Sequence, residues 1–465
     1  MEKQLPKNWV ECKLGELATV QSGGTPSRGI NSYWNGDIPW VKISDIKEMY
    51  VDKTTEFITE EGLKNSSTRI FPKGTILFTI FATLGKIGIL NIDAATNQAI
   101  AGITPSNFID DKYLTYSLIN LSNSISEYGK GVAQKNINQA ILKDTIIPLP
   151  PLQEQSRIVE KLDNMFYQLE TIKASMANIP LLLKDFRQQV LSQAVTGKLT
   201  EEWRVGKELE EWKYEFAKDC CEKVQSGGTP KGSNFATSGI PFLKVYNIVN
   251  NKIDFEYNPQ YVSDKIQNSQ IKKSITFPDD VIMNIVGPPL NKIAIIPDDY
   301  PEWNLNQAIT LFRVKDYLSN KFLYYFFCRG SSVKSLVNET KGVVGQVNIS
   351  LSQCRDFSIP IPSIKEQQEI VSRIESLFAK ADIIEKQYKT LKQKIEDLPQ
   401  AILHKAFKGE LVEQLESDGD AKELLAAIQK LKAGVAKVVQ RKATTNKVKT
   451  YSENAAIFGM VAEPK

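Results

Sequence analysis

The sequence predicts an α+β fold in which two mixed α/β domains are separated by two long helices that pair as an antiparallel coiled coil. Three observations predict it: an internal repeat with a period of about 200 residues, β-rich runs in the front part of each repeat, and a heptad pattern in the back part. A chain of 465 residues has room for about two to four domains. Two equal halves of one chain relate most simply by a pseudo-twofold axis, which makes the two helices antiparallel.

The repeat is visible in motifs that recur in the same order. QSGGTP stands at Gln21–Pro26 and again at Gln225–Pro230. Each repeat ends with a proline-rich hinge, IPLPPLQEQ from Ile147 and IPIPSIKEQ from Ile359. The hinges lie 212 positions apart, and this spacing stays constant through the helices, whereas it drifts in the front parts. The helical part of the repeat therefore has a fixed geometry, and the front parts accept insertions and deletions.

The front part of each repeat mixes short apolar runs with turns. We predict buried strands at Thr75–Phe81, Lys86–Ile92, Ile240–Val245 and Ile293–Ile296, and short helices at Tyr113–Leu121 and Lys321–Cys328. Gly23-Gly24 and Gly227-Gly228 indicate tight turns, with a phosphate-binding loop as the alternative.

The same patterns predict the domain boundaries. They are 1–150 for the first domain, 151–212 for the first helical region, 213–362 for the second domain, 363–435 for the second helical region and 436–465 for a basic tail. We expect the tail to be flexible, with contact to DNA or to a partner as the alternative.

On both helices, apolar residues recur at alternating steps of three and four positions, which is the spacing of a coiled-coil core. The predicted core residues are Leu162, Met165, Leu169, Ile172, Met176, Ile179, Leu183, Phe186, Val190, Ile374, Leu377, Ala381, Ile384, Tyr388, Leu391, Ile395, Leu398 and Ile402. The alternative is that each helix packs on its own globular half. Gly197 and Gly409 are predicted to end the helices, and Pro180 and Pro399 to kink or break them. Ser363 with Glu366 fits a capping box.

The composition excludes several catalytic classes. His404 is the only histidine, so a Ser-His-Asp or Cys-His site would lack its base, and most histidine-ligated metal sites are excluded. The sequence contains no P-loop, no adenine-methyltransferase signature of the N-P-P-[YF] or D-P-P-Y type, and no convincing nuclease cluster. We therefore predict no catalytic residue and no metal site in this chain.

Cysteine content and hydropathy favour a cytoplasmic protein without membrane contact. The five cysteines are odd in number and lack a C-x-x-C pair, which indicates reduced thiols without a disulfide framework or structural zinc. No segment has the apolar run of a signal peptide or of a membrane span. The formal net charge of +4 permits nucleic acid binding without requiring it.

Both front parts carry side chains suited to base edges and phosphates. Asn and Gln can pair bidentately with adenine, and Lys binds guanine or phosphate oxygens. The predicted DNA-contacting residues are Lys42, Ser44, Lys86, Asn97, Gln98, Lys130, Gln134, Lys135 and Asn136 in the first half, and Lys244, Tyr246, Asn247, Lys292, Asn306, Gln307, Lys341, Gln346 and Asn348 in the second. Their recurrence can also reflect shared folding needs, so a purely structural role is the alternative for each of them.

Two variable domains alternating with two nearly repeated helical segments resemble the specificity (S) subunit of type I restriction–modification enzymes. The resemblance spans nearly the whole chain and rests on the I-P-[LI]-P-x-x-x-E-Q hinges, on FRQQVLSQAVTGKLTEEW from Phe186 and on LPQAILHKAFKGELVEQL from Leu398. The last two segments look most like the subgroup found in enteric bacteria. The resemblance implies that 1–150 and 213–362 are target recognition domains and that the helices are constant regions.

In that family the subunit is non-catalytic and binds a bipartite, asymmetric double-stranded DNA target. Its partners are two modification subunits, which use S-adenosylmethionine to methylate adenine at N6, and restriction subunits, which use ATP and Mg²⁺. The resemblance therefore implies no cofactor in this chain and all three in its partners, with the helices setting the spacing of the half-sites. Two alternatives stay open: a coiled-coil scaffold whose end domains bind proteins, and a self-sufficient methyltransferase or nuclease.

Overall fold

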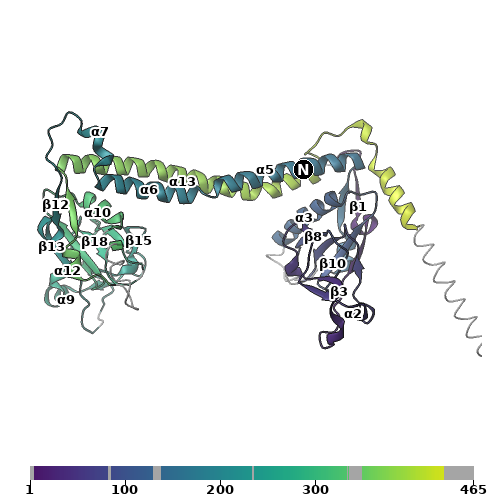
Figure 1. Ribbon diagram of the computed structural model, residues 1–465, viewed down its shortest axis with the longest axis horizontal. Helices are drawn as coiled ribbons and strands as arrows, with labels where there is room; N and C mark the ends of the chain where they lie inside the picture. Colours follow the sequence, from purple (N-terminus) through teal and green to yellow (C-terminus); the bar gives the residue numbers. More distant parts are fainter. Residues whose placement is uncertain are drawn as a thin grey trace, which may run out of the picture. The chain divides into compact units, whose positions relative to one another are not determined.

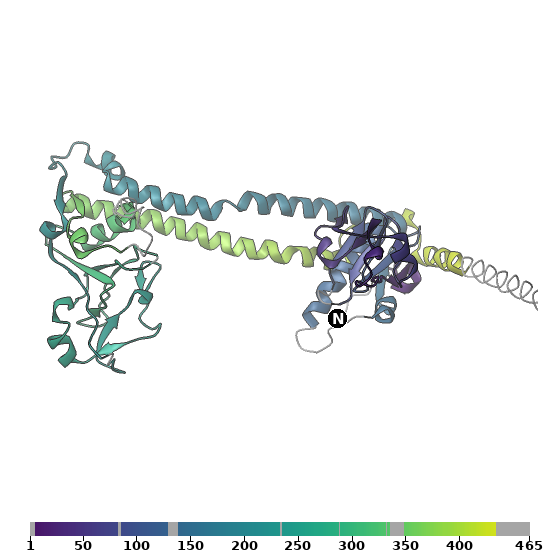
Figure 2. The ribbon, with the colours of Figure 1, turned by 60° about the horizontal axis from the view of Figure 1, so that its bottom comes forward.

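The computed structural model describes residues 5–81, 85–128, 138–232, 235–287, 289–331, 333–334 and 348–433 (Figure 1). The chain divides into two compact units, Met1–Ser175 with Leu391–Lys465 and Met176–Thr390. Each unit contains one mixed α/β domain and one stretch of paired helices (Figure 2). The predicted fold class is confirmed: two α/β repeats alternate with two long helical segments.

The first domain contains two sheets, with strand orders β2-β10-β7-β8-β4 and β5-β3-β9-β6. Apolar residues such as Val41, Leu77 and Ile100 form its core. The central strand β7 is buried along its whole length, and β10 and β8 pair with its two edges. The elements are β1 (Val10–Lys13), α1 (Leu14–Leu17), β2 (Ala18–Ser22), β3 (Trp34–Val41), β4 (Tyr50–Val51), β5 (Glu56–Ile58), α2 (Glu60–Lys64), β6 (Ile70–Phe71), β7 (Ile76–Thr79), β8 (Ile87–Leu90), β9 (Ala94–Thr96), β10 (Ile100–Pro105), α3 (Asp111–Tyr128), α4 (Gln139–Asp144) and β11 (Ile146–Leu149).

The second domain repeats this plan, with strand orders β13-β21-β18-β19 and β17-β14-β20. Its elements are β12 (Lys213–Phe216), α8 (Ala217–Cys220), β13 (Cys221–Ser226), β14 (Ile240–Leu243), β15 (Ile248–Val249), β16 (Lys252–Ile253), β17 (Tyr261–Val262), α9 (Asp264–Ser269), β18 (Val281–Asn284), β19 (Ile293–Ile295), β20 (Asn304–Leu305), β21 (Ile309–Val314), α10 (Asn320–Cys328), α12 (Leu351–Arg355) and β22 (Ser358–Ile361). The four predicted strands and both predicted helices are confirmed, and α3 is longer than expected.

A short antiparallel ladder closes each domain, because its first strand pairs with the hinge strand: β1 with β11, and β12 with β22. The glutamine of the repeated E-Q motif then joins the domain to the helix that follows. The Gln155 side chain accepts from the backbone N of Asp110 (2.9 Å) and donates to the Pro150 carbonyl (3.0 Å). Gln367 makes the same pair of contacts with Ser319 (2.7 Å) and Pro362 (2.8 Å). Both glutamines are fully buried, so this part of the motif serves the fold.

The glutamate of the E-Q motif is also fully buried in both repeats. Glu366 accepts hydrogen bonds from the Thr200 hydroxyl (2.7 Å) and the Trp212 indole N–H (3.0 Å), and it pairs with Arg204 at 3.3 Å. The predicted capping box is therefore only half present. The Ser363 hydroxyl accepts from the Glu366 backbone N at 3.4 Å. The Glu366 carboxylate, which would complete the box by binding the Ser363 backbone N, instead accepts from Thr200 and Trp212.

Replacing Glu366 with alanine is expected to destabilise the second unit by about 3–5 kcal/mol, because two hydrogen-bond donors and the Arg204 cation would lose their buried anionic partner. Thermal unfolding of the full chain measures the effect. Glu369→Ala is the matched control, since its ion pair with Arg373 one turn along the same helix is partly exposed and worth well under about 1 kcal/mol. Equal shifts for the two variants would contradict the role assigned to the buried cluster.

The first helical segment consists of two helices, α5 (Leu152–Met176) and α6 (Ile179–Val195), whereas the second is the single helix α13 (Ile364–Phe407). Pro180 stands in the first turn of α6, where its missing N–H costs nothing, so the predicted break occurs just before it. Pro399 lies inside α13, which continues past it. Gly197 and Gly409 both adopt the left-handed conformation shortly after their helices end, as predicted for helix stops.

The helices run antiparallel within each unit. In the second unit, Arg187 pairs with Asp382 (2.7 Å) and Glu385 (2.9 Å), and Arg373 donates to the Leu199 carbonyl at 2.9 Å. In the first unit, Arg157 near the start of α5 binds Asp418, which follows the end of α13 (2.6 Å). Both views show α5 beside the C-terminal part of α13 and α6 beside its N-terminal part (Figures 1 and 2).

The predicted coiled-coil core needs correction, because the seam buries mainly one of the two apolar positions in each heptad. The buried members are Leu162, Leu169, Met176, Leu183, Val190, Ile374, Ala381, Ile395 and Ile402, and the half-buried ones are Met165, Ile179, Leu377 and Tyr388. The prediction is wrong for Ile172, Phe186, Ile384, Leu391 and Leu398, which are 37–48% exposed. Two helices share only a narrow line of contact, and the second apolar row lies beside it. At one end the alternative also holds, because Val190 and Ile374 join the core of the second domain.

In the second unit, the three partners of Glu366 come from the connection between α6 and β12. In the first unit, two segments that are far apart in the sequence take that place, one before β1 and one after α13. Glu154, the counterpart of Glu366, accepts from Asn8 (3.3 Å) and from Gln414 (3.0 Å). A Cβ on Gly409 would collide with Pro6. A helical stretch at 421–433 then packs on the first domain, where Lys432 donates to the carbonyl oxygens of Gly15 (2.7 Å) and Ala18 (3.0 Å).

Candidate nucleic-acid interface

The repeated glycine pair brings two loops into close contact in each domain. Gly23 and Gly24 donate to the backbone carbonyls of Ile100 (3.0 Å) and Thr96 (2.9 Å), and a Cβ on Gly23 would collide with Thr96. Gly227 and Gly228 make the equivalent bonds to Ile309 (2.8 Å) and Leu305 (3.0 Å). The glycines are therefore required for close packing of the two loops. The predicted tight turn is wrong, because neither pair lies in a turn, and the backbone N–H groups that a phosphate-binding loop would use are bonded to carbonyls of the protein.

In the first domain, five predicted residues converge at the ends of neighbouring strands. Val41 ends β3, and its carbonyl accepts from the backbone N of Asn97 at 3.3 Å. The Lys86 ammonium donates to the carbonyl of Ile43 at 3.3 Å, next to Lys42 and Ser44. Gln98 accepts a hydrogen bond from the Thr25 hydroxyl, just after the glycine pair.

The second domain builds the same cluster with different side chains. The backbone N of Asn306 donates to the Leu243 carbonyl at 2.9 Å, and the Lys292 ammonium donates to the Val245 carbonyl at 3.4 Å, between Lys244 and Tyr246. Gln307 accepts from the Thr229 hydroxyl, as Gln98 does from Thr25. The side-chain oxygen of Asn306 is buried and has no hydrogen-bond partner among the described residues. Four segments far apart in sequence thus meet in each repeat.

The two clusters differ in charge. Lys42 forms an ion pair with Glu56 at 2.6 Å, and Arg28 binds the other carboxylate oxygen at 2.6 Å. The hydrogen bond from Lys42, assisted by Arg28, lowers the pKa of the Glu56 carboxyl. The strand position of Glu56 is taken by Gln260 in the second domain, and within the described residues Lys244 has no carboxylate at ion-pair distance. In the first cluster, Glu56 therefore neutralises part of the positive charge. In the second cluster, the described residues place no carboxylate that does so for Lys244.

Aromatic side chains flank both clusters. The Arg28 guanidinium lies over the Trp34 ring at 3.7 Å, and Trp34 meets Trp40 edge-on at 5.1 Å. In the second domain, Tyr246 meets Tyr257 edge-on at 6.0 Å, and burial raises the pKa of the Tyr246 phenol. Its hydroxyl therefore stays protonated at neutral pH and donates to the Asn258 carbonyl at 3.2 Å.

One predicted contact residue is wrong. Asn247 is fully buried, and its side chain donates to the carbonyls of Asp254 (3.1 Å) and Tyr257 (3.0 Å) while accepting from the Lys244 backbone N (3.0 Å). Asp45 caps the same turn in the first domain by accepting from the Lys42 backbone N at 2.9 Å. The recurrence of this position reflects a turn that both domains need.

Six of the remaining predicted residues lie outside the described residues: Lys130, Gln134, Lys135, Asn136, Lys341 and Gln346. Asn348 is described and exposed. Reasoning from the sequence missed Thr25 and Thr229, although both belong to the repeated QSGGTP motif, and it missed Glu56, whose partner Lys42 was recognised.

Among the described residues, no group of three or more His, Cys, Asp or Glu side chains is placed to hold a metal ion. All five cysteines are free thiols, and burial raises the pKa of Cys12, Cys328 and Cys354 to about 12. None of the described helices is both long enough and apolar enough to cross a membrane. What the clusters offer is lysine, asparagine, glutamine and aromatic side chains, which recognise nucleic acids by hydrogen bonding and stacking.

A family model, curated relatives and a solved structure all point to the same protein family. The family model described as "Type I restriction modification DNA specificity domain" matches residues 6–180 and 209–393. The chain is 28% identical to the EcoBI specificity subunit of Escherichia coli over 95% of both chains. It is 27% identical to the EcoKI specificity subunit of E. coli strain K12, covering 96% of this chain and 99% of that protein. The HsdS subunit from Thermoanaerobacter tengcongensis has the same fold, with a TM-score of 0.63 and 19% identity over 88% of this chain.

Proposed function

Because the chain belongs to the family of type I restriction–modification DNA specificity subunits, we propose that it reads a bipartite, asymmetric duplex target with the two clusters described above. The observation that carries the proposal is the repetition of one backbone scaffold with different side chains. Ser44 becomes Tyr246 and Glu56 becomes Gln260 on matched backbones. Duplex DNA has a local twofold axis, so two related but unequal domains suit two unequal half-sites.

Methyl transfer and cleavage would belong to partner chains. Two modification subunits would bind S-adenosylmethionine and methylate a flipped adenine at N6, and restriction subunits would use ATP and Mg²⁺. This chain would act in the cytoplasm and contribute no catalytic residue. Exposed apolar side chains on the helix pair would give a docking surface for the modification subunits: in the second unit they include Leu181, Leu182, Phe186, Ile383 and Ile384, all 37–63% exposed. A protein-binding scaffold without DNA is not favoured, since it leaves the repeated polar clusters unexplained.

The test is a map of N6-methyladenine in cells that carry this chain with its neighbouring methyltransferase subunit, compared with cells in which this chain is deleted. We expect one bipartite, asymmetric motif to lose its methylation completely. A single-residue control, Lys73→Ala on the exposed turn before β7, should leave the map unchanged. If deletion changes no motif, the chain is not the reader.

The charge difference between the clusters gives a prediction of its own. Replacing Lys244 with alanine should reduce the slope of log affinity against log salt by about 0.9, the value for one phosphate contact, whereas Lys42→Ala should reduce it by less because Glu56 already neutralises that ammonium. Glu56→Gln, which reproduces the second domain, should steepen the slope and tighten binding several-fold. Fluorescence anisotropy titrations of the target at several salt concentrations measure all three, and equal slopes for Lys42→Ala and Lys244→Ala would contradict the assignment.

A further inference from the structure

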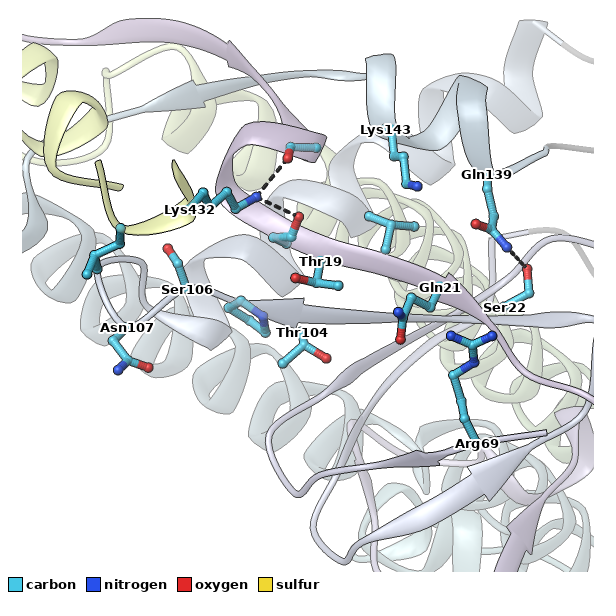
Figure 3. A pocket seen from close by; sticks show the side chains of 15 residues that line it. Thr19, Gln21, Ser22, Arg69, Thr104, Ser106, Asn107, Gln139, Lys143 and Lys432 are labelled. Atoms are coloured by element: carbon cyan, nitrogen blue, oxygen red, sulfur yellow. Dashed lines mark hydrogen bonds between the residues drawn. The ribbon is translucent and has the colours of Figure 1, made fainter. Parts of the chain in front are cut away.

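The first domain has a groove that the clusters do not explain. It has a volume of 1140 Å³ and follows β2, with walls from β10, α4 and the stretch at 421–433. Figure 3 shows Thr19 and Gln21 on β2, with Arg69, Lys143 and Lys432 placed around them. β2 is an edge strand of its sheet, so one side of it faces this groove.

The lining is positive and polar. Arg69 and Lys143 are both exposed, and within the described residues neither forms an ion pair with a carboxylate. Lys432 is held differently, since its ammonium donates to Gly15 and Ala18 and burial lowers its pKa. The Arg69 and Lys143 side chains are therefore available to bind an anionic ligand. Lys432 instead attaches the helical stretch at 421–433 to Gly15 and Ala18.

The second domain fills the corresponding space with its own side chains. Thr19 and Thr104 face each other across β2 and β10, and the matching pair on β13 and β21 is Lys223 and Arg313. Arg313 binds Asp280 at 2.7 Å, and Lys223 donates to the Ile275 carbonyl at 3.4 Å. Arg355, which stands 212 positions after Lys143, donates to the Val224 carbonyl at 3.3 Å. The cations at these positions are bonded to groups of the protein itself, whereas Arg69 and Lys143 of the first domain are exposed.

The groove is continuous with the first cluster. The Gln139 side chain donates to the Ser22 hydroxyl at 2.5 Å, immediately before the glycine pair that positions Thr25 against Gln98. On the other wall, the Thr68 hydroxyl donates to the Thr96 carbonyl at 3.4 Å. Arg69 follows Thr68 in the sequence, and Asn97 of the cluster follows Thr96. The groove and the cluster are thus joined through Ser22–Thr25 on one wall and through Thr68 and Arg69 on the other.

We propose that this groove binds the phosphate backbone of the duplex that flanks the half-site read by the first domain. The inference rests on the proposed function and extends it, since it gives the complex a sequence-independent contact on one side of the target only. Arg69 and Lys143 supply the charge, and Gln21, Gln139 and Thr19 supply hydrogen bonds to phosphate oxygens. An acidic protein segment is the competing ligand, and the test separates the two.

The test measures binding of the full-length chain, with its methyltransferase partner, to duplexes that contain the methylated motif. The duplexes carry no flank, or a flank of about one helical turn on one side or on the other. We expect one of the two flanks, and not the other, to tighten binding. Arg69→Ala combined with Lys143→Ala should abolish that gain and reduce the salt slope on the flanked duplex by about 1.8, the value for two phosphate contacts. Binding to the duplex without flanks should not change.

Lys7→Ala combined with Lys73→Ala is the matched control, because it removes two exposed charges of the same domain outside the groove. The proposal is overturned if neither flank matters to the wild-type chain, or if the groove variant keeps the gain. The second result, combined with loss of methylation, would favour an acidic protein segment as the ligand. Failure of the proposed function is distinct, because then even the duplex without flanks would not be bound in preference to unrelated DNA.

Discussion

Exchanging residues 10–149 for the corresponding segment of the EcoKI specificity subunit is expected to change one half of the methylated motif and to leave the other half unchanged. The boundaries follow from the structure, since β1 and β11 pair from Val10 to Leu149 and close the domain on itself. Everything that forms the first cluster lies between them, from Thr25 to Gln98. Methylation of the original motif should fall to background, and a new motif sharing one half-site should appear in an N6-methyladenine map.

The exchange has a structural control. The stretch at 421–433 contacts the first domain, where Gln429 donates to Glu16 at 3.0 Å and Lys432 caps α1, so a foreign domain would lose these contacts. A second chimera should therefore also carry the EcoKI counterpart of 421–433. Both chimeras should show the same new motif, with the second more stable to heat. A change in both half-sites would mean that the domains do not read DNA independently.

The sequence allowed the architecture to be predicted because the repeat constrains it. Three motifs recur where segments of the chain are hydrogen-bonded together: QSGGTP, the hinges, and NQAI, which stands at Asn97–Ile100 and at Asn306–Ile309. The glycine pair bonds Thr96, Asn97 bonds Val41, and the Gln155 side chain bonds Asp110. Such positions are shared by both halves since both halves need the same turns. The same reasoning misled at Asn247, which recurs in kind with Asp45 because both cap a turn.

Two features could not be read from periodicity. The heptad stripe marks which residues are apolar, but it does not say how many helices share the seam, and a pair leaves residues such as Ile384 and Leu391 exposed. The groove along β2 depends on small side chains, Thr19 and Thr104, where the other repeat has Lys223 and Arg313. The motifs that recur identify residues that the two repeats share. The groove depends on positions at which the repeats differ, so the recurring motifs do not reveal it.

The exposed apolar residues of the helices and the groove along β2 bear on function in the same way. The residues that recur hold the backbone, whereas the residues that differ or stay exposed are those to which we assign the binding of DNA and partner chains. The clusters combine both properties, because a repeated scaffold presents residues that are not repeated, such as Ser44 and Tyr246. The helix pair follows the same division, since its buried residues serve the fold and its exposed apolar residues form the docking surface that we propose.

Replacing Leu182 and Ile383 with aspartate is therefore expected to abolish methylation while leaving the fold and DNA binding intact. Both side chains are more than half exposed, at 63% and 58%, so their removal leaves no cavity in the helix seam. Each buries apolar area worth about 1.5–3 kcal/mol if a partner covers it, and a buried aspartate adds a desolvation cost. Association with the methyltransferase subunit should weaken by at least about 100-fold.

Size-exclusion chromatography of the two purified proteins measures association, and anisotropy with the target duplex measures DNA binding by this chain. Leu182→Met combined with Ile383→Met is the matched control, because it keeps both positions apolar and should retain the complex. The ion pairs of Arg187 with Asp382 and Glu385 hold the two helices together close to these positions, so an unchanged thermal midpoint will show that the pairing survives. A complex that persists in the aspartate variant would place the modification subunit on another surface of the chain.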